Sequence, residues 1–517
     1  MIKLLTADEM RALDRATSEA FGLPSIVLME HAGKGVAQAA RAMLGQAARH
    51  VCLVCGKGSN GGDGFVAARW LLRWGYVPEI FLVGRCDEVE GDARANLDLC
   101  LKTGLEVEEI TGDADYVLLA GSLRRSALVI DALLGTGLSG PPRPAVGQAI
   151  RQIAGVKRPV LSVDIPSGVN ADTGEAFDPH VVADRTVTFG AWKRGLALHP
   201  GAACAGVIEL VDIGLPQALL NELDRVPVLV ERADVAALLP PRAPEFHKGD
   251  AGRALLVAGS RRFGGAALLA ARAACRGGAG LVTLASVGAL ADALRVQTPE
   301  AMFVGLPEGD DGGLGPGALD RLAGVLAECH AVGIGPGLGT GLGARDLLAG
   351  LVKAAQSPLV LDADGLNLLA QNPELLDGVD LPWVMTPHPG EAARLLKVDA
   401  RRVQSDRLGA AVALSRRFGC AVLLKGARTV VASPQGRCHL NPTVNPAMAS
   451  GGMGDALTGL LTALLAQGLA PTDAALASAW LHGRAAELCS HCPEAGLLAS
   501  DVIAALPAAR GALHTDS

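Results

Sequence analysis

Residues 50–75 have the sequence HVCLVC-GKGSNGGDG-FVAARWLLRWG. A short apolar run, a glycine-rich turn and an amphipathic stretch in this order are typical of the strand-turn-helix unit of a parallel α/β sheet. Glycines let successive backbone amides face an anion, and the following helix adds the positive end of its dipole. The segment therefore predicts a doubly wound fold with a phosphate cradle, although the glycines could also serve a tight turn alone.

The same alternation of apolar runs and amphipathic stretches continues through the chain, and it predicts mostly parallel sheets. A length of 517 residues exceeds what one hydrophobic core accommodates, so we expect two α/β domains. Strands are expected near residues 51–55, 79–83, 128–132, 159–164, 184–189 and 206–211 in the first half. In the second half they are expected near 253–259, 281–285, 331–335, 358–362, 383–386, 420–425 and 428–432. A proline-containing stretch without a strong strand pattern before residue 253 predicts the domain boundary at 215–240.

Composition narrows the classes of partner. The net charge is -7, aromatic residues make up 3% of the chain, and no long block of Lys and Arg occurs. Such a chain has no electrostatic footprint for nucleic acid or for an anionic membrane. No uncharged apolar stretch reaches the roughly 20 residues that span a bilayer. Thr6 and Glu9 form a capping box that opens a helix, where a signal peptide would need an apolar core. We therefore expect small-molecule partners and a cytoplasmic protein.

Eleven cysteines, an odd number, are scattered along the chain and predict free thiols. Cys52 and Cys55 lie three apart in an expected strand, so they point to opposite faces and cannot share a metal. Cys489, His491 and Cys492 offer zinc ligands, but no spacing supplies a complete four-ligand site.

The glycine segment departs from two common nucleotide-binding motifs. Gly56, Gly58 and Gly61 satisfy G-x-G-x-x-G, but the acidic residue expected about 20 positions later, which would bind a ribose, is missing. The Gly-Lys-Ser/Thr ending of a P-loop is also missing. An ordinary NAD-binding Rossmann site is therefore disfavoured.

Two more expected strands of the first half end in an aspartate. Asp131 leads into a glycine-rich stretch, and Asp164 leads into Ile-Pro-Ser167-Gly. Open α/β sheets bind ligands at this carboxyl edge, although a strand-end aspartate can also simply cap the next helix. Asn60, Asp131 and Ser167 could supply oxygen ligands to a cation. With so few carboxylates, a monovalent ion is the better candidate.

The second half has its strongest motif at residues 445–455, NPAMASGGMGD, immediately before the apolar stretch ALTGLLTALLAQG. Amides of Gly452, Met453 and Gly454 at a helix start would form an anion hole, with Asp455 in the first turn. This pairing suits phosphoryl transfer, because the carboxylate can accept a proton from the attacking hydroxyl. The helix dipole alone would also favour an aspartate there.

Four segments of the first half, SNGGDG (59–64), DALLGTGLSGPPR (131–143), DIPSGVNADTG (164–174) and TFGAWKRGL (188–196), together resemble the YjeF-type NAD(P)H-hydrate epimerase domain. The resemblance covers residues 1–215 and implies a Rossmann-like three-layer fold. It implies that the hydrated dinucleotide is bound by Asn60, Gly61, Gly62, Asp63, Gly64, Gly135, Thr136, Gly137, Leu138, Ser139, Gly140, Pro141 and Asp164. Asn60, Asp131 and Ser167 would bind K⁺. Asp164 would serve acid-base chemistry, and Lys193 would either contact a phosphate or be a solvated loop lysine.

The second half is similar to ribokinase-like kinases, and five further segments resemble the NAD(P)H-hydrate dehydratase branch: KGDAGR (248–253), GIGPGLG (333–339), LDADGLN (361–367), TPHPGE (386–391) and KGART (425–429). The resemblance implies a ribokinase-like domain at 241–510 after a linker at 216–240. The hydrate pocket would be lined by Ala266, Gly337, His388 and Asp455. The nucleotide would be bound by Lys425, Gly426, Ala427, Arg428, Thr429 and Gly454, together with Mg²⁺. His388 could instead cap its own turn, and Met453 stands where many relatives have Thr or Ser.

The combined resemblance implies a bifunctional nicotinamide-nucleotide repair enzyme and a homo-oligomer. It would epimerise the R and S hydrates of NADH and NADPH and would dehydrate the S-hydrate with ADP, which gives AMP and phosphate. ADP in place of ATP is implied by the fused arrangement. One alternative makes the second half a small-molecule kinase for a vitamin precursor, with the first half as its regulatory module. Another makes the first half a non-catalytic binding module.

Overall fold

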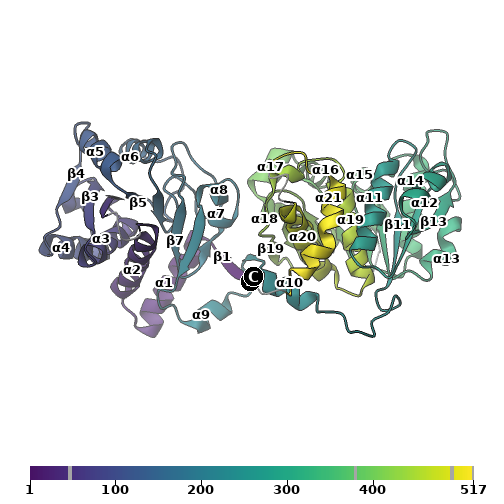
Figure 1. Cartoon of the computed structure of the whole chain (residues 1–517), viewed down its shortest axis with the longest axis horizontal. Coiled ribbons are helices and arrows are strands. Elements are labelled where there is room, and N and C mark those ends of the chain that lie inside the picture. Colours follow the sequence, from purple (N-terminus) through teal and green to yellow (C-terminus); the bar gives the residue numbers. More distant parts are fainter. Residues whose placement is uncertain (45–48, 378–380, 490–493, 515–517) are drawn as a thin grey trace. The chain divides into compact units, whose positions relative to one another are not determined.

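The computed structural model describes residues 1–44, 49–377, 381–489 and 494–514. Within this range the chain forms two compact units, Ile2–Pro227 and Val228–Ser517 (Figure 1). Both units are α/β with mostly parallel strands, which confirms the predicted fold class. The division between them falls inside the range 215–240. The suggested zinc group cannot be assessed, because His491 and Cys492 lie outside the described residues.

The first unit contains a sheet of order β4-β3-β2-β5-β6-β7-β9 in which all neighbouring strands are parallel. Its strands are β2 (His50–Cys55), β3 (Val77–Val83), β4 (Val107–Ile110), β5 (Leu128–Ala132), β6 (Val160–Val163), β7 (Arg185–Phe189) and β9 (Val207–Val211). The chain runs from β2 outward to β4 and returns to the other side of β2 as β5. Such a switch point is where open α/β sheets bind ligands. Only β4 was missed in this sheet, because its sequence Val-Glu-Glu-Ile lacks an apolar run.

Helices cover both faces of this sheet and make three layers. On one face lie α2 (Ser25–Leu44), α3 (Ser59–Arg73) and α4 (Gly91–Lys102). On the other face lie α5 (Asp115–Arg125) and α6 (Pro144–Gly155). Cys55 is buried with the first group and Cys52 with the second, which confirms that they point to opposite faces. Both are free thiols.

The N-terminal segment closes one end of this unit. Strand β1 (Ile2–Leu5) pairs in parallel with β8 (Trp192–Lys193), and α1 (Ala7–Phe21) follows. Thr6 and Glu9 form the predicted capping box of α1. The remaining helices of the unit are α7 (Arg194–Ala197), α8 (Gly201–Cys204) and α9 (Gln217–Glu222). The pairing of β1 with β8 brings α1 near Lys193.

The second unit has the strand order β13-β12-β11-β14-β15-β16-β17-β18-β19-β10, parallel except where β18 meets β17 and β19. Its strands are β10 (Val228–Leu229), β11 (Arg253–Val257), β12 (Leu281–Val287), β13 (Met302–Leu306), β14 (Ala331–Ile334), β15 (Leu359–Leu361), β16 (Trp383–Met385), β17 (Ala421–Leu424), β18 (Val430–Ala432) and β19 (Cys438–Leu440). The order reverses at β11, so its switch point lies between β11 and β14. Three strands of this sheet were not predicted from the sequence, namely β13, β19 and the two-residue β10, which lies in the stretch without a strong strand pattern and pairs with β19.

The helices of the second unit include a buried layer of α11 (Gly264–Arg276), α19 (Met453–Ala466), α20 (Pro471–Leu488) and α21 (Ala499–Gly511) (Figure 1). The others are α10 (Arg232–Leu238), α12 (Ala291–Gln297), α13 (Ala323–Leu326), α14 (Leu342–Ala354), α15 (Asp364–Gln371), α16 (Pro389–Leu396), α17 (Ala400–Ser405) and α18 (Arg407–Phe418). Together α9, β10 and α10 occupy much of the predicted linker 216–240. None of the described helices has the length and apolarity to cross a membrane.

Candidate active sites

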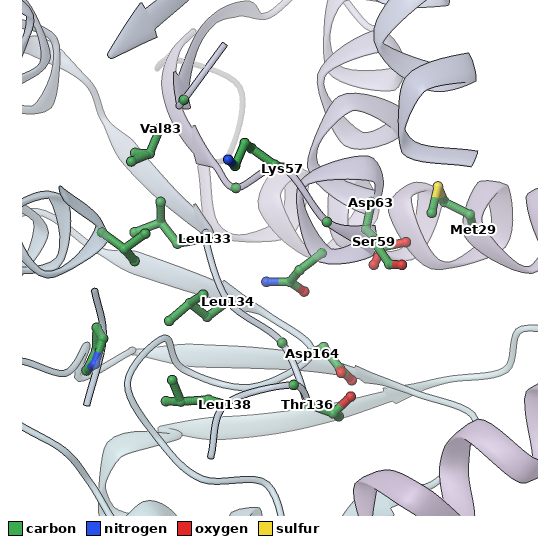
Figure 2. Close-up of a pocket in the computed structure, with 18 of the residues that line it drawn as sticks. Met29, Lys57, Ser59, Asp63, Val83, Leu133, Leu134, Thr136, Leu138 and Asp164 are labelled. Atoms are coloured by element: carbon green, nitrogen blue, oxygen red, sulfur yellow. The ribbon is translucent and has the colours of Figure 1, made fainter. Parts of the chain in front are cut away.

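A cavity of about 1200 Å³ opens at the carboxyl edge of the first sheet. The segments after β2, β5, β6 and β7 line it, together with residues of α1 and α2 (Figure 2). The predicted site residues that line it are Asn60, Asp63, Gly135, Thr136, Gly137, Leu138, Ser139, Gly140, Pro141 and Asp164. The cavity therefore lies at the switch point between β2 and β5, as the fold would place a ligand.

The glycine segment differs from the predicted loop, because α3 already begins at Ser59. The amide of Gly62 donates to the carbonyl of Gly58 (3.1 Å), so the first-turn amides of Ser59, Asn60 and Gly61 are the ones that the helix leaves unbonded. Gly61, Gly62 and Gly64 do not line the cavity. A Cβ at Gly64 would lie 2.8 Å from Cys55 Sγ and the Ala132 Cβ, so this glycine serves close packing.

Asn60 is the predicted cation ligand whose side chain has free hydrogen-bonding capacity. It is 8% exposed, it lines the cavity, and neither its Oδ1 nor its Nδ2 has a hydrogen-bond partner. Buried amides are normally paired, so an unpaired one beside a cavity indicates a ligand or an ion.

Both carboxylate oxygens of Asp131 accept hydrogen bonds from the protein. Its Oδ2 accepts from Ser162 Oγ and from the Ser167 amide, both at 2.9 Å. Its Oδ1 accepts from Ser167 Oγ at 2.5 Å and, more weakly, from the Leu133 amide at 3.4 Å. Burial raises the pKa of Asp131, and these hydrogen bonds oppose the shift. Asp131 therefore anchors the loop after β6, and only its Oδ1 retains capacity for a cation.

Asp164 follows β6 with a φ of 65°, a conformation that aspartate adopts at some energetic cost. Lys193 Nζ lies 2.5 Å from Asp164 Oδ1, and Thr188 Oγ1 donates to the same oxygen at 3.2 Å. The Lys193 side chain is 1% exposed. The alternative that it is a solvated loop lysine is therefore wrong, because this buried ion pair fixes it at the cavity.

Two more carboxyl groups line the same cavity. Burial raises the pKa of Asp63 well above its usual range, and the charge of Asp164 adds to the effect. Burial also raises the pKa of Asp14 to about 6, which Lys193 opposes and Asp164 reinforces. Figure 2 shows Asp63 on its helix and Asp164 beyond its strand, both among the lining residues. Asp14, Asp63 and Asp164 thus all interact with the ammonium group of Lys193.

In the second unit, loops after β11, β14 and β15 meet. A Cβ at Gly337 would lie 3.0 Å from the Ala266 Cβ, so these two predicted residues are neighbours. Ser260 Oγ donates to the Gly337 carbonyl at 2.8 Å. A Cβ at Gly335 would lie 1.8 Å from the Asp362 carbonyl, so glycine is required where the two loops touch.

A buried charge network joins β15, β17 and α19. Lys425 Nζ donates to Asp362 Oδ1 at 2.7 Å and lies 3.9 Å from Glu391. Thr458 Oγ1 donates to Asp362 Oδ2 at 2.6 Å. Burial lowers the pKa of Lys425, but the two carboxylates outweigh it and the net pKa is raised. A Cβ at Gly454 would lie 3.4 Å from Lys425 Nζ, so the ammonium group sits at the start of α19.

Asp455 lies in the first turn of α19, after the N-cap Gly452. Burial raises its pKa to about 6, and the charge of Asp362 adds to the shift while Lys425 opposes it. The amide of Ala456 is the first that bonds within the helix, to Gly452. The amides of Met453, Gly454 and Asp455 are thus left for an anion. The Met453 side chain packs into the core.

His388 caps α16. Its Nδ1 accepts from the amides of Gly390 (3.0 Å) and Glu391 (3.4 Å), so its hydrogen lies on Nε2 when the ring is neutral. Burial and then Lys425 lower the pKa of His388, which favours this neutral form. The side chain is 50% exposed. His388 therefore does cap its own turn at the start of α16, as the alternative interpretation predicted. The cap uses Nδ1 and leaves the Nε2-H group as a donor.

The predicted nucleotide loop between β17 and β18 is held by Arg407, which donates to the carbonyls of Leu424 and Lys425. Gly426 has a φ of 138°, and a Cβ there would lie 2.7 Å from the Arg407 guanidinium. Burial lowers the pKa of both Arg407, to about 10, and Arg428. Each retains an unpaired Nε. Arg428 in the loop and Arg407 at the start of α18 thus each have one guanidinium nitrogen available to a ligand.

Several polar residues of these sites were not assigned from the sequence, namely Asp14, Asp362, Glu391 and Arg407. Asp14 had a usable signal, since it lies between Met10 and Thr17 on the buried face of α1. Asp362 ends a strand, as Asp131 does. Among the described residues, no three His, Cys, Asp or Glu side chains are placed to share a metal ion.

Known proteins match both units. A family model described as NAD(P)H-hydrate dehydratase matches residues 254–508, and one described as YjeF-related protein N-terminus matches residues 25–195. The bifunctional NAD(P)H-hydrate repair enzyme Nnr of Moorella thermoacetica is 43% identical over 507 residues, which are 98% of this chain and 96% of that protein. The chain belongs to the family of bifunctional NAD(P)H-hydrate repair enzymes. The family member of Escherichia coli K12 is 35% identical and covers 97% of this chain and 92% of its own.

Solved structures similar to this repair enzyme include the ADP/ATP-dependent NAD(P)H-hydrate dehydratase of Bacillus subtilis, co-crystallised with ATP and Mg²⁺. It is 32% identical with a TM-score of 0.49, and the match covers 56% of this chain and all of that one. A ribokinase-like superfamily protein of Enterococcus faecalis is 26% identical with a TM-score of 0.49, and the match covers 56% of this chain and 96% of that one.

Proposed function

We propose that this enzyme epimerises the R and S hydrates of NADH and NADPH, and dehydrates the S-hydrate to the reduced dinucleotide with ADP, giving AMP and phosphate. The epimerase would occupy residues 1–215 and the dehydratase 241–510. The observation that supports this best is that the chain matches the repair enzyme of Moorella thermoacetica over both units. In the first unit Asp164 lines the same cavity as Ser59 and Asn60, and in the second unit Asp455 lies in the first turn of α19. A cytoplasmic location and a homo-oligomer remain predictions.

In the second unit Asp455 would accept the proton of the hydrate hydroxyl as that oxygen attacks the terminal phosphorus of ADP, with AMP as leaving group. The amides of Met453 and Gly454, with Lys425 beside them, would stabilise the charge on the moving phosphoryl group. The C–O bond of the resulting phosphate ester would then break, phosphate would leave with the electron pair, and the neighbouring carbon would lose a proton. The ring double bond is thereby restored.

The remaining predicted residues would position the two substrates of the second unit. Gly337 and Ala266 would form a side-chain-free surface against the hydrate, and the Nε2-H of His388 would donate to it. The loop from Lys425 through Gly426, Ala427, Arg428 and Thr429 would hold the nucleotide, with Gly454. Mg²⁺ would be bound with the nucleotide and would neutralise part of the phosphate charge.

In the first unit the hydrate would occupy the cavity, with its phosphates at the amides of Ser59 and Asn60 and at the segment Gly135–Pro141. Asp164 would exchange protons with the hydrated ring. A K⁺ ion would fit the unpaired Oδ1 of Asn60, with Asp131 Oδ1 and Ser167 as further oxygens. The ion would supply positive charge beside the dinucleotide.

A mixture of hydrate epimers with ADP tests the whole proposal. Full conversion to the reduced cofactor, followed by its absorbance, requires both activities, whereas conversion that stops when the S-hydrate is consumed indicates a dehydratase alone. A small-molecule kinase would leave a stable phosphorylated product and no absorbance. A parallel reaction with ATP measures the nucleotide preference.

A further inference from the structure

Asp14 is a half-buried acidic residue of α1, spaced so that it lies on the same helix face as the buried residues Ala7, Met10 and Thr17. It lines the cavity of the first unit. Its Oδ1 is buried and has no hydrogen-bond partner among the described residues. A buried carboxyl oxygen without a donor is costly, so its retention beside a cavity points to a role with a ligand.

An independent group in the same cavity points the same way. The Asn60 side chain, on α3, is 8% exposed, and its Nδ2, which a K⁺ ion at Oδ1 would leave unsatisfied, has no hydrogen-bond partner among the described residues. Unsatisfied polar groups therefore enter the cavity from α1 and from α3. A polar ligand between these helices would satisfy both.

The chemistry of epimerisation requires two proton-transfer groups. Water adds to the ring double bond at the carbon next to nitrogen, because nitrogen stabilises positive charge there. To invert this carbon, its hydroxyl must take up a proton and leave as water while the nitrogen lone pair forms a C=N bond. A water molecule then adds to the opposite face and releases one proton. One residue on one face cannot serve both steps.

We infer that Asp14 is the second acid-base residue of the epimerase site, donating the proton to the departing hydroxyl while Asp164 accepts the proton of the entering water. The inference rests on the proposed epimerase function. One proton leaves Asp14 and one reaches Asp164, so the bonds and charges balance without a co-reactant. In the reverse direction the two residues exchange roles. The carboxyl groups then re-equilibrate through the open cavity.

The surroundings of the two residues support this division. Asp164 is the ion-pair partner of Lys193, which suits a proton acceptor. Asp14 lines the cavity with Asp63, Asp164 and Lys193, whose charges interact with its carboxyl group, and Arg11 of its own helix lines the cavity as well. Its burial and the charge of Asp164 favour the protonated form, which suits a donor.

The test is D14N, which keeps the shape of the side chain but removes its acidity. Pure R-hydrate without ADP is followed by chromatographic separation of the epimers. We expect kcat to fall at least 100-fold with KM unchanged, and the loss of rate that the wild type shows as pH rises through about 6 to disappear. D14E should recover part of kcat. Dehydration of S-hydrate with ADP measures the amount of folded chain.

The matched control is D8N, the same change on the same helix at an exposed residue whose carboxylate pairs with Arg11. It should epimerise at the wild-type rate. If wild-type protein does not interconvert the epimers, the proposed function fails. The inference about Asp14 is wrong if the wild type interconverts the epimers and the kcat of D14N lies within threefold of the wild-type value. It is also wrong if D14N raises KM without lowering kcat.

Discussion

The two units place the same ingredients, a helix N-terminus, a strand-end aspartate and a buried lysine, at the carboxyl edge of a parallel sheet, but they connect them differently. In the first unit Lys193 pairs with Asp164, the proposed acid-base residue itself. In the second unit Lys425 pairs with Asp362, and Asp455 remains outside the ion pair. Lys193 therefore orients the proposed reacting carboxylate, Asp164, in the first unit. In the second unit Lys425 instead lies beside the amides at the start of α19.

This difference follows from the chemistry that each site would perform. Phosphoryl transfer requires positive charge where the phosphoryl group moves, so an ammonium beside Gly454 is useful there. Inversion of a ring carbon transfers protons and no phosphoryl group. In the first unit the ammonium group of Lys193 therefore serves to orient the carboxylate of Asp164.

The largest effect is expected for D455N, because it removes the carboxylate that the first turn of α19 places beside its own unbonded amides. Dehydration should fall about 10³-fold, near 4 kcal/mol of activation free energy, while epimerisation is unchanged. Initial rates of absorbance gain on S-hydrate with ADP measure the first activity, and separation of the epimers measures the second. A fall of less than tenfold would remove Asp455 from the role of base.

K193M should be the next largest effect. Without the ammonium, Asp164 loses its ion-pair partner, while the carboxyl groups of Asp63 and Asp14 remain nearby. Epimerisation should fall about 10²-fold while dehydration is retained. K193R keeps the charge and should lose less. Equal epimerisation by wild type and K193M would show that the ion pair serves folding alone.

The pH dependence of dehydration should reflect the raised pKa of Asp455, about 6. A base acts in its ionised form, so kcat/KM should fall about tenfold per pH unit below pH 6. The raised pKa of Asp455 also makes the free energy of unfolding depend on pH. An aspartate with a raised folded pKa stabilises the fold at low pH, and this contribution is lost as the pH rises through about 6. D455N should therefore have a higher Tm than wild type at pH 8, and the gain should disappear near pH 4. A flat rate profile between pH 5 and 7 would contradict this assignment.

The sequence predicted those features that depend on residues close together in the chain, and it missed those that depend on contacts between distant segments. The strands, the capping box of α1 and the opposite faces of Cys52 and Cys55 follow from periodicity within a few residues. The partners of Lys193 and Lys425 depend on which loops meet at a sheet edge, and composition does not encode that. The hydrogen bonds that Asp131 accepts from Ser162 and Ser167 could not be predicted from sequence spacing either, because they depend on β5 and β6 being neighbours in the sheet.

The smallest effect concerns the glycines that were predicted to cradle a phosphate. G64A should destabilise the first unit by about 1–3 kcal/mol, because the new Cβ would lie 2.8 Å from both the Ala132 Cβ and Cys55 Sγ. The matched control is G121A, the same change inside α5, where the nearest atom is the end of the Arg125 side chain at 3.5 Å. It should stabilise by about 0.5–1 kcal/mol, since alanine is the better helix former. Chemical denaturation of both variants measures the two signs. If G64A unfolds like wild type but loses hydrate affinity, then Gly64 serves the ligand, and the contrast between packing glycines and the open first-turn amides is wrong.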